Sequence, residues 1–370
     1  MCSRKVIVVA IAIVVGCSHA AQQRPPDTDR ANVTSDPRDA TAQDATDLDA
    51  LFALDAPLDA TEATDAEAEP PDDPMALHKE TKADLLALID VKPLTDAEFR
   101  IVRPDIFLAF NVGPAVTRMN QGNKAIAHHA IGRRACLRAL EGVVIQTDEQ
   151  RERCGAPNMI PIYRRGDPKS ATYCIDAFEF PNKPCELPFV WAAPTHAQAM
   201  CAIQGKRLCT QEEWSLACRA DPAGGPDTPY AYGDELDLDV CNTNKPRGPQ
   251  NKCTPTSAEK TWETCSTDTE PSGAFPKCKS RFGVYDQHGN VAEIMTRRDK
   301  DGTLVSQLKG SAFFYAEVAR KANEPQGPGR ETYPDTCNFD PRWHVEPMSG
   351  AWHVNYHLGF RCCKSIAPQK

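Results

Sequence analysis

The chain has 370 residues, of which 41% are hydrophobic and 25% are charged, and its formal net charge is −9. The acidic residues are concentrated in residues 18–74, whose net charge is −12, so the rest of the chain is close to neutral. A near-neutral domain lacks the basic footprint of nucleic-acid-binding proteins, and we expect no nucleic-acid partner.

Residues 1–17 have the pattern of a bacterial lipoprotein signal. Arg4 and Lys5 precede the apolar run Val6–Val15, which is too short to cross a bilayer as a helix. The run ends in VVGC, which is similar to a lipobox, so we predict that Cys17 becomes the lipidated mature N-terminus. The alternatives are an ordinary cleaved signal with a chance cysteine, or an uncleaved anchor.

Residues 18–74 are rich in Asp, Ala, Thr and Pro, and their bulky apolar side chains lie mainly in the segment 48–58. Such a segment buries too little apolar surface to offset the entropy of ordering it. We therefore predict a disordered acidic tether. It would hold an exported domain away from a membrane at the cell envelope, which we expect to be the outer membrane.

Residues 75–153 are predicted to form a helical extension, either a small subdomain or a set of braces against the main domain. Thr81–Ile89 and the longer segment Lys124–Val143 have apolar side chains at helical spacing. His128 and His129 would point in different directions on a helix, so we expect surface histidines and no shared metal.

From residue 154 to residue 366 short β-type segments alternate with joints rich in Pro and Gly. This pattern predicts an α+β domain with many irregular loops, which needs cross-links to stay ordered. The expected strands lie within Met159–Tyr163, Tyr173–Phe180, Gly283–Thr296, Thr303–Phe314 and His357–Cys363.

Two short helices are predicted in the middle of this domain. Thr210 and Glu213 form a capping-box pattern at the start of one of them. The segment 194–198 repeats the pattern for a helix that ends at Gly205. Apolar side chains of the helix after Thr210 share one face, at i, i+3 and i+4: Trp214, Ala217 and Cys218.

The 16 cysteines predict a disulfide scaffold. Cys2 would be lost with the signal and Cys17 would carry lipid, which leaves an even number for up to seven disulfides in an exported chain. No CxxC pair is present to suggest a metal site. Cys362 and Cys363 are adjacent on an expected strand, so they would point to opposite faces and belong to different bridges.

Six ordered motifs resemble the formylglycine-generating, sulfatase-modifying factor proteins, whose domain is a variant of the C-type-lectin-like fold. The segment GKRLCTQEEW resembles the GxRLPTEAEW motif of that family most closely. The resemblance implies an α+β, loop-rich, disulfide-stapled domain of this type. The motifs are YCIDAFEFPN (173–182), GKRLCTQEEW (205–214), YAYGD (230–234), FGVYDQHGNVAE (282–293), LKGSAF (308–313) and LGFRCC (358–363).

The resemblance also implies where catalytic cysteines would lie. Aerobic enzymes of this family bind copper through two cysteines about five residues apart, between an LRGGS-type strand and the terminal GFRC; thiolates suit Cu(I) because both are soft. Here that interval, 312–360, contains only Cys337, and the segment 316–321 has no cysteine. We therefore expect neither copper nor formylglycine generation.

Calcium is the cofactor that the resemblance favours. Asn290 and Glu293 match the GNxWE motif of the family, and Asn242 matches a second asparagine position; oxygen donors of this kind suit Ca²⁺. Ala292 and Ile294 replace the tryptophans usual in the family. The alternative is that Asn290 only shapes a turn and Glu293 pairs with an arginine.

A cluster of aromatic and histidine residues precedes the last motif. We predict a binding surface for a protein, peptide or glycan ligand, with ordinary loop packing as the alternative. The spacing of two of the histidines, four residues apart, would suit a metal only on a helix. The cluster comprises Trp343, His344, Trp352, His353, Tyr356 and His357.

Two functions follow from these observations. The first is a binding or scaffolding module at the envelope, anchored to the membrane through its N-terminal lipid and without catalytic activity. The second is a metal-dependent oxidase of the same superfamily, which oxidises a protein cysteine with relocated catalytic residues. The missing cysteine pair favours the first.

Overall fold

The computed structural model describes residues 71–90, 119–245, 252–322, 335–342, 344–350 and 353–367. The signal segment with Cys17, the tether up to residue 70, and both Trp343 and Trp352 lie outside these ranges. Among the helices in these ranges, none is long and apolar enough to cross a membrane.

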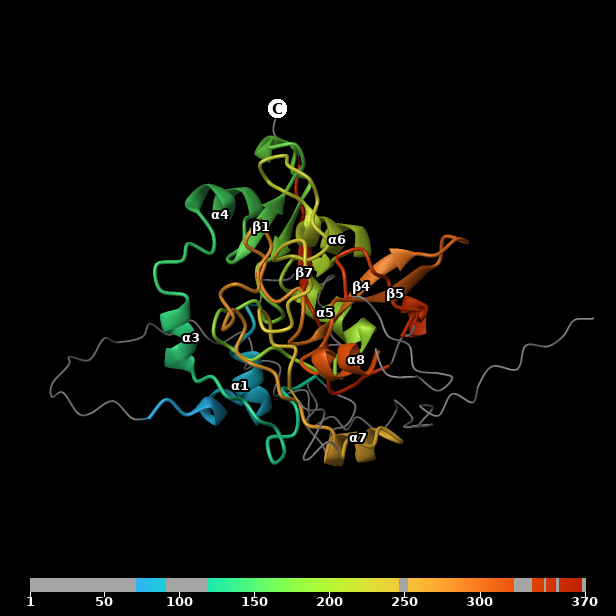
Figure 1. The fold of residues 1–370 in the computed structure, drawn as a ribbon. Coiled ribbons are helices and arrows are strands. Elements are labelled where there is room, and N and C mark those ends of the chain that lie inside the picture. Colours follow the sequence, from blue (N-terminus) through green and yellow to red (C-terminus); the bar gives the residue numbers. More distant parts are fainter. Residues whose placement is uncertain are drawn as a thin grey trace, which may run out of the picture.

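Two small sheets form the centre of the fold (Figure 1). The first is antiparallel, with strand order β1-β2-β7-β3; the second has the order β5-β4-β6, with β4 and β6 parallel. Each of the predicted strand segments overlaps at least one of these strands, although β4 extends two residues beyond its predicted segment. The strands are β1 (Met159–Ile162), β2 (Tyr173–Asp176), β3 (Arg207–Leu208), β4 (Ala292–Arg298), β5 (Leu304–Lys309), β6 (Leu358–Phe360) and β7 (Cys362–Ser365).

The chain passes from the second sheet to the first at Arg361, which separates β6 from β7. Its side chain is fully buried and forms an ion pair with Glu293 on β4. The same guanidinium donates hydrogen bonds to the backbone oxygens of Asp176 and Tyr285, at 3.1 Å and 2.8 Å. Arg361 therefore holds both sheets at their junction.

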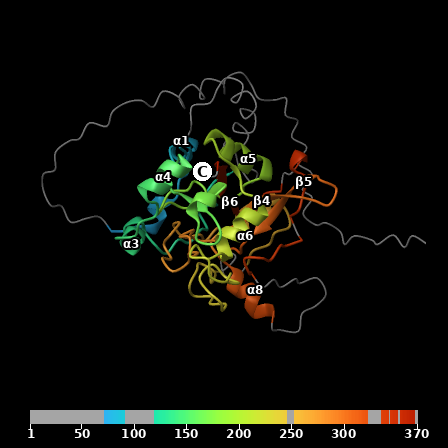
Figure 2. The same cartoon turned by 90° about the horizontal axis from the view of Figure 1, so that it is seen from above.

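Helices cover the sheets on several sides. Seen from above, α6 lies beside β4 (Figure 2), and α6 also contacts β5, while α5 contacts β3 and β4. The helices are α1 (Lys82–Leu86), α3 (Arg133–Ala139), α4 (Asp148–Cys154), α5 (Pro194–Ile203), α6 (Gln211–Arg219), α7 (Ala258–Thr264) and α8 (Tyr315–Ala322), with 3-10 turns η3 (Pro74–Leu77), η4 (Pro168–Ser170) and η6 (Met348–Gly350).

The predicted start of α6 is confirmed and that of α5 is wrong. Thr210 Oγ1 accepts the backbone N–H of Glu213, and the Glu213 carboxylate accepts the N–H of Thr210. The apolar residues predicted for one face of α6 are all buried. By contrast α5 begins at Pro194 after Ala193 with no side-chain cap, because the methyl group of Ala193 cannot accept a hydrogen bond.

The longer helix predicted over Lys124–Val143 is also wrong, since only α3 forms within it. The N–H groups of His128 and Ala130 donate to the carboxylates of Asp268 and Glu270, which replaces the helical hydrogen bonds. Tertiary contacts here override local helix propensity. His129 is buried, and its ring nitrogen Nδ1 lies 2.5 Å from the backbone oxygen of Thr269. The prediction of a surface position for His129 is therefore wrong.

The helical extension packs into the main core. Leu85 and Met119 belong to one buried apolar cluster with α5 and β6, and Leu140 belongs to a second one with α6. In Figures 1 and 2, α1 and α3 lie on the side opposite the β4–β5 hairpin. The described parts of the extension are therefore in contact with the domain.

Seven disulfides cross-link the described residues, as predicted, and they use all fourteen cysteines there. Cys362 and Cys363 belong to different bridges, which confirms that they point to opposite faces. Many disulfides indicate an oxidising compartment, as in exported proteins. The bridges are Cys136–Cys185, Cys154–Cys174, Cys201–Cys362, Cys209–Cys363, Cys218–Cys337, Cys241–Cys278 and Cys253–Cys265.

Candidate functional site

No free thiol remains among the cysteines that the structure describes, since each of them forms a disulfide. Residues 316–321, where the family would place its copper-binding pair, lie on α8. This helix carries no cysteine, and Cys337 is bonded to Cys218. Copper does not fit the residues of this interval as they stand, because no thiolate is present to bind it.

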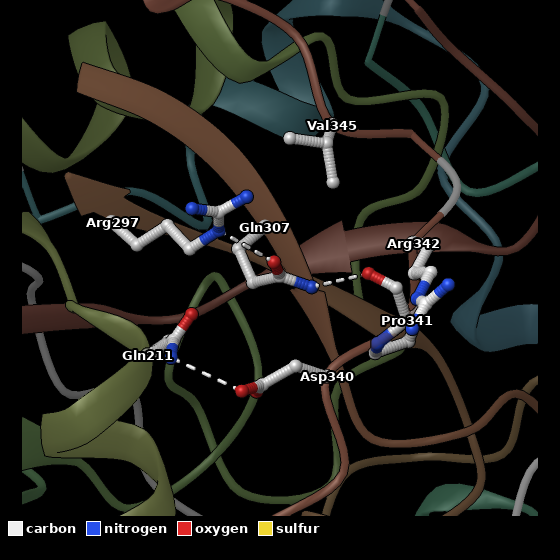
Figure 3. A pocket seen from close by; sticks show the side chains of 7 residues that line it. All are labelled: Gln211, Arg297, Gln307, Asp340, Pro341, Arg342 and Val345. Carbon is white, nitrogen blue, oxygen red and sulfur yellow. Dashed lines mark hydrogen bonds between the residues drawn. The ribbon is translucent and has the colours of Figure 1, made fainter. Parts of the chain in front are cut away.

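A pocket of about 320 Å³ opens beside the β4–β5 hairpin, between the start of α6 and the loop that follows residue 339 (Figure 3). Ligand pockets begin at about this volume. Five of its seven lining residues are polar or charged, and they come from four separate segments. The lining residues are Gln211, Arg297, Gln307, Asp340, Pro341, Arg342 and Val345.

Hydrogen bonds fix the polar groups of the pocket relative to one another. Arg297 on β4 donates from Nε to Oε1 of Gln307 on β5, at 2.9 Å. Gln307 in turn donates from Nε2 to the backbone oxygen of Pro341, at 2.8 Å. Gln211 donates from Nε2 to Oδ2 of Asp340, at 3.1 Å (Figure 3). The hairpin, α6 and the loop thus form one hydrogen-bonded rim.

Lys309 supports the pocket through its contact with Asp340. Its side chain is fully buried, and its ammonium group donates to Oδ1 of Asp340 at 2.9 Å and to the backbone oxygens of Cys337 and Phe339. The ammonium group also lies 5.2 Å from the centre of the Trp214 ring. Burial lowers the pKa of Lys309, and the nearby Asp340 carboxylate opposes that shift. This contact set fixes the shape of the loop that lines the pocket.

The charges of the pocket favour an anionic ligand. Asp340 is neutralised by Lys309 and Arg297 pairs with Asp299 on the hairpin, which leaves the guanidinium group of Arg342 as the charge in excess. Guanidinium groups bind carboxylates through paired hydrogen bonds. Oε1 of Gln211 is buried and accepts no hydrogen bond from the described residues, so it is suited to a ligand hydroxyl or N–H.

The structure arranges the predicted binding surface as two pairs of rings. His344 and His353 stack with their ring centres 4.0 Å apart, and burial lowers the pKa of His344 to about 3, with a contribution from His353. Tyr356 and His357 pack against Phe314 instead. Tyr356 is buried, so it contributes to packing. The other two members, Trp343 and Trp352, lie outside the described residues.

The predicted calcium ligands are engaged with protein groups. Asn242 donates from Nδ2 to Oδ1 of Asn290, at 2.9 Å. Glu293 accepts from Arg361 Nε at 2.6 Å and from Trp214 Nε1 at 2.8 Å. Glu293 therefore directs its charge toward an arginine, and the three side chains do not form a shared oxygen cage in this arrangement. Calcium binding through this trio stays a prediction that these hydrogen bonds do not favour.

Buried carboxyl groups outnumber the cation at the junction of the sheets. Glu179, Asp286 and Glu293 surround Arg361, and all four side chains are buried. Burial raises the pKa of Glu179 well above its usual range, and the charges of Asp286 and Glu293 add to the shift. Burial also raises the pKa of Asp286 to about 7. This cluster lies where the two sheets meet, and we call the two sheets with this junction the frame of the domain.

Sequence reasoning missed the residues of the pocket. Gln211 follows a recognised helix cap, but nothing in its context marks it as a ligand-binding residue. Arg297 and Gln307 lie ten residues apart and meet only because the β4–β5 hairpin pairs their neighbours. Only the loop of the pocket lies close to a predicted ligand-binding residue, because His344 of the predicted binding surface directly precedes Val345.

Comparison with known proteins supports the resemblance. The sequence profile of the Sulfatase-modifying factor enzyme 1-like domain matches residues 174–366. Two curated relatives, from Mus musculus and Bos taurus, are both named inactive C-alpha-formylglycine-generating enzyme 2. The first is 33% identical over 186 residues, which cover 50% of this chain and 51% of the relative. The second is 33% identical over 151 residues, which cover 38% and 46%.

The chain therefore spans about half the length of the curated relatives it matches. Among solved structures, the crystal structure of CarF is 18% identical and covers 49% of this chain and 69% of its own, with a TM-score of 0.28. A score this low supports no argument about shared architecture.

Proposed function

Because this chain belongs to the family of the Sulfatase-modifying factor enzyme 1-like domain, we propose that it is an exported binding module of that family that generates no formylglycine. The observation that carries the proposal is the pairing of every described cysteine in a disulfide, which leaves no thiol pair for copper. The two relatives whose names contain the word inactive support the same conclusion.

Within this proposal, the pocket beside the β4–β5 hairpin binds the ligand. Arg342 supplies positive charge, Arg297 adds a guanidinium group that also pairs with Asp299, and Oε1 of Gln211 can accept a hydrogen bond. This set suits a carboxylate-bearing peptide or glycan. Lys309 keeps the loop in place, so the site is organised before the ligand arrives, which reduces the entropy cost of binding.

The catalytic half of the proposal is tested by an oxidation assay. The full chain, supplied with Cu(I) and oxygen, is incubated with a cysteine-containing sulfatase peptide, and the peptide mass is followed. We expect no aldehyde product beyond that formed by copper alone. Turnover that depends on the protein would contradict the proposal and favour the oxidase alternative.

The binding half is tested on an array of carboxylate-bearing glycans and peptides with their neutral counterparts. We expect binding to acidic members, and a loss of at least tenfold in affinity for Arg297→Gln and Arg342→Gln, since a charge-assisted hydrogen bond contributes about 1.5–3 kcal/mol. Arg298→Gln is the matched control, because Arg298 donates to the hairpin oxygen of Gly302. Equal binding of all variants would place the ligand elsewhere.

We also propose that the chain is anchored to the envelope through lipid on Cys17, with the acidic segment as its tether. The support is the VVGC motif after an apolar run. Metabolic labelling with a radioactive fatty acid should mark the full chain in a bacterial host and fail to mark Cys17→Ser. Equal labelling of the two would refute the anchor.

A further inference from the structure

A second cluster, none of whose residues lines the pocket, lies around the disulfide between Cys218 on α6 and Cys337. The sulfur atoms of both cysteines and Nε2 of His288 all lie within 4.8 Å of one another, and all three residues are buried. Nε2 of His288 is 3.5 Å from Sγ of Cys218 and 3.9 Å from Sγ of Cys337. Among the described residues, this is the cluster in which three groups with metal-binding chemistry converge.

Hydrogen bonds set His288 in the tautomer that can bind a metal. Nδ1 of His288 lies 3.2 Å from Oδ2 of Asp335, and that oxygen accepts a hydrogen bond from Ser311 at 2.5 Å. Nε2 accepts the backbone N–H of Ala231 at 3.0 Å, so it carries a lone pair and Nδ1 carries the proton. A histidine that binds a metal through one ring nitrogen usually donates the N–H of its other ring nitrogen, often to a carboxylate.

Aromatic rings enclose the cluster. The rings of Tyr230 and Tyr232 lie 5.8 Å and 5.4 Å from the His288 ring, and the Trp214 ring lies 6.5 Å from it. Tyr230 and Tyr232 also stack on each other at 5.6 Å. A structural disulfide needs no oriented histidine beside it, and here the imidazole is positioned from three sides.

We propose that reduction of the Cys218–Cys337 disulfide converts this cluster into a three-ligand site for a thiophilic d¹⁰ cation, Zn²⁺ or Cu⁺. The ligands are two thiolates and Nε2 of His288. Two-cysteine, one-histidine sets bind Zn²⁺ with a fourth position open, and thiolates also select Cu⁺. The proposal is independent of ligand binding at the pocket.

The distances suit this change. In a tetrahedral site with metal–sulfur bonds of about 2.3 Å and metal–nitrogen bonds of about 2.0 Å, nitrogen and sulfur are about 3.5 Å apart. The two nitrogen–sulfur distances are already close to that value. Only the sulfur atoms must separate, to about 3.7 Å, which breaking their bond permits. The metal would replace the hydrogen bond from Ala231.

The chemistry balances with a dithiol as the reductant. The dithiol gives two electrons and two protons to the two sulfur atoms and becomes a cyclic disulfide. The two thiols of Cys218 and Cys337 then release their protons to solvent as the cation binds. No other oxidant or reductant is needed.

The experiment measures zinc bound to the full chain before and after mild reduction. The chain is treated with dithiothreitol, which is removed by gel filtration without oxygen, and thiols at Cys218 and Cys337 are identified by alkylation and mass spectrometry. We expect one more Zn²⁺ per reduced chain than per oxidised chain, and protection of the two thiols from alkylation. Cu⁺ in place of Zn²⁺ shows which cation binds more tightly.

Variants separate this site from zinc held by other reduced cysteines. Cys218→Ala/Cys337→Ala should lose the additional Zn²⁺, whereas Cys154→Ala/Cys174→Ala, which removes another disulfide, should keep it. Asp335→Asn should weaken zinc binding by about 10–100-fold through the orientation of His288. The proposal fails if Cys218→Ala/Cys337→Ala binds as much zinc as the parent. It also fails if the Cys218–Cys337 bond resists reduction until the chain unfolds.

Discussion

Two buried cations hold different parts of this domain in different ways. Arg361 lies at the junction of the two sheets, among the carboxyl groups of Glu179, Asp286 and Glu293. Lys309 binds one carboxylate, that of Asp340 in the pocket lining, together with two backbone oxygens. Around Arg361 carboxyl groups outnumber the cation and burial raises the pKa of Glu179 and Asp286, whereas Lys309 faces one carboxylate and its remaining donors go to the backbone.

The difference separates the frame of the domain from its candidate binding site. Arg361 connects residues of regular strands, so its loss should affect the whole fold. Lys309 connects a strand to an irregular loop, so its loss should affect that loop and the pocket first. Substitutions at the two positions therefore test whether the frame and the pocket are energetically distinct.

The largest effect is expected for Arg361→Met. Removing the guanidinium leaves Glu293 buried without its counter-charge, which costs about 3–5 kcal/mol of the free energy of unfolding. Urea denaturation at neutral pH measures the loss. The double variant Arg361→Met/Glu293→Gln should recover most of it, because an intact buried pair is often no more stable than a neutral replacement. A loss below about 1 kcal/mol in the single variant would show that the pair does not hold the frame.

Lys309→Met should have a smaller effect on stability and a larger one on the pocket. Three hydrogen bonds from the ammonium group are lost, but Asp340 is 40% exposed and can be solvated, so we expect a loss of about 2–3 kcal/mol. Limited proteolysis of the loop around residues 337–345 should become faster, and binding on the acidic array should be lost. Lys364→Met is the matched control. The ammonium group of Lys364 also donates to a backbone oxygen, that of Gly155, which does not belong to the pocket loop. Unchanged proteolysis would show that the loop holds its shape without Lys309.

Much of the frame could be predicted from the sequence, because its signals are local. The capping box of α6 uses residues three positions apart, and adjacent cysteines on a strand must face opposite ways. Glu293 and Arg361 both lie in motifs that resemble the family. The alternative to calcium binding predicts an arginine partner for Glu293 but does not say which arginine.

The candidate sites could not be predicted, because their residues meet only in the folded chain. Cys218 and Cys337 are 119 residues apart, and His288 carried no signal of its own. The segment 124–132 looked helical because its apolar spacing is helical, yet its N–H groups bind the side chains of Asp268 and Glu270. Contacts between distant segments, a disulfide in the first case and hydrogen bonds in the second, decide these cases.

The last prediction concerns the frame alone and uses Asp286. Burial raises the pKa of this carboxyl to about 7, above its unfolded value of about 3.9, although the N–H of Gly273 donates to it. The stability that the protonated group contributes is complete below about pH 4 and is lost as pH rises through 7. Between pH 5 and pH 8 the free energy of unfolding should therefore fall by about 2–3 kcal/mol more in the parent chain than in Asp286→Asn. Urea denaturation at both pH values measures the difference, with the exposed Asp234→Asn as control. Binding at the pocket should be the same in all three proteins, and a change there in Asp286→Asn would show that the frame and the pocket are coupled.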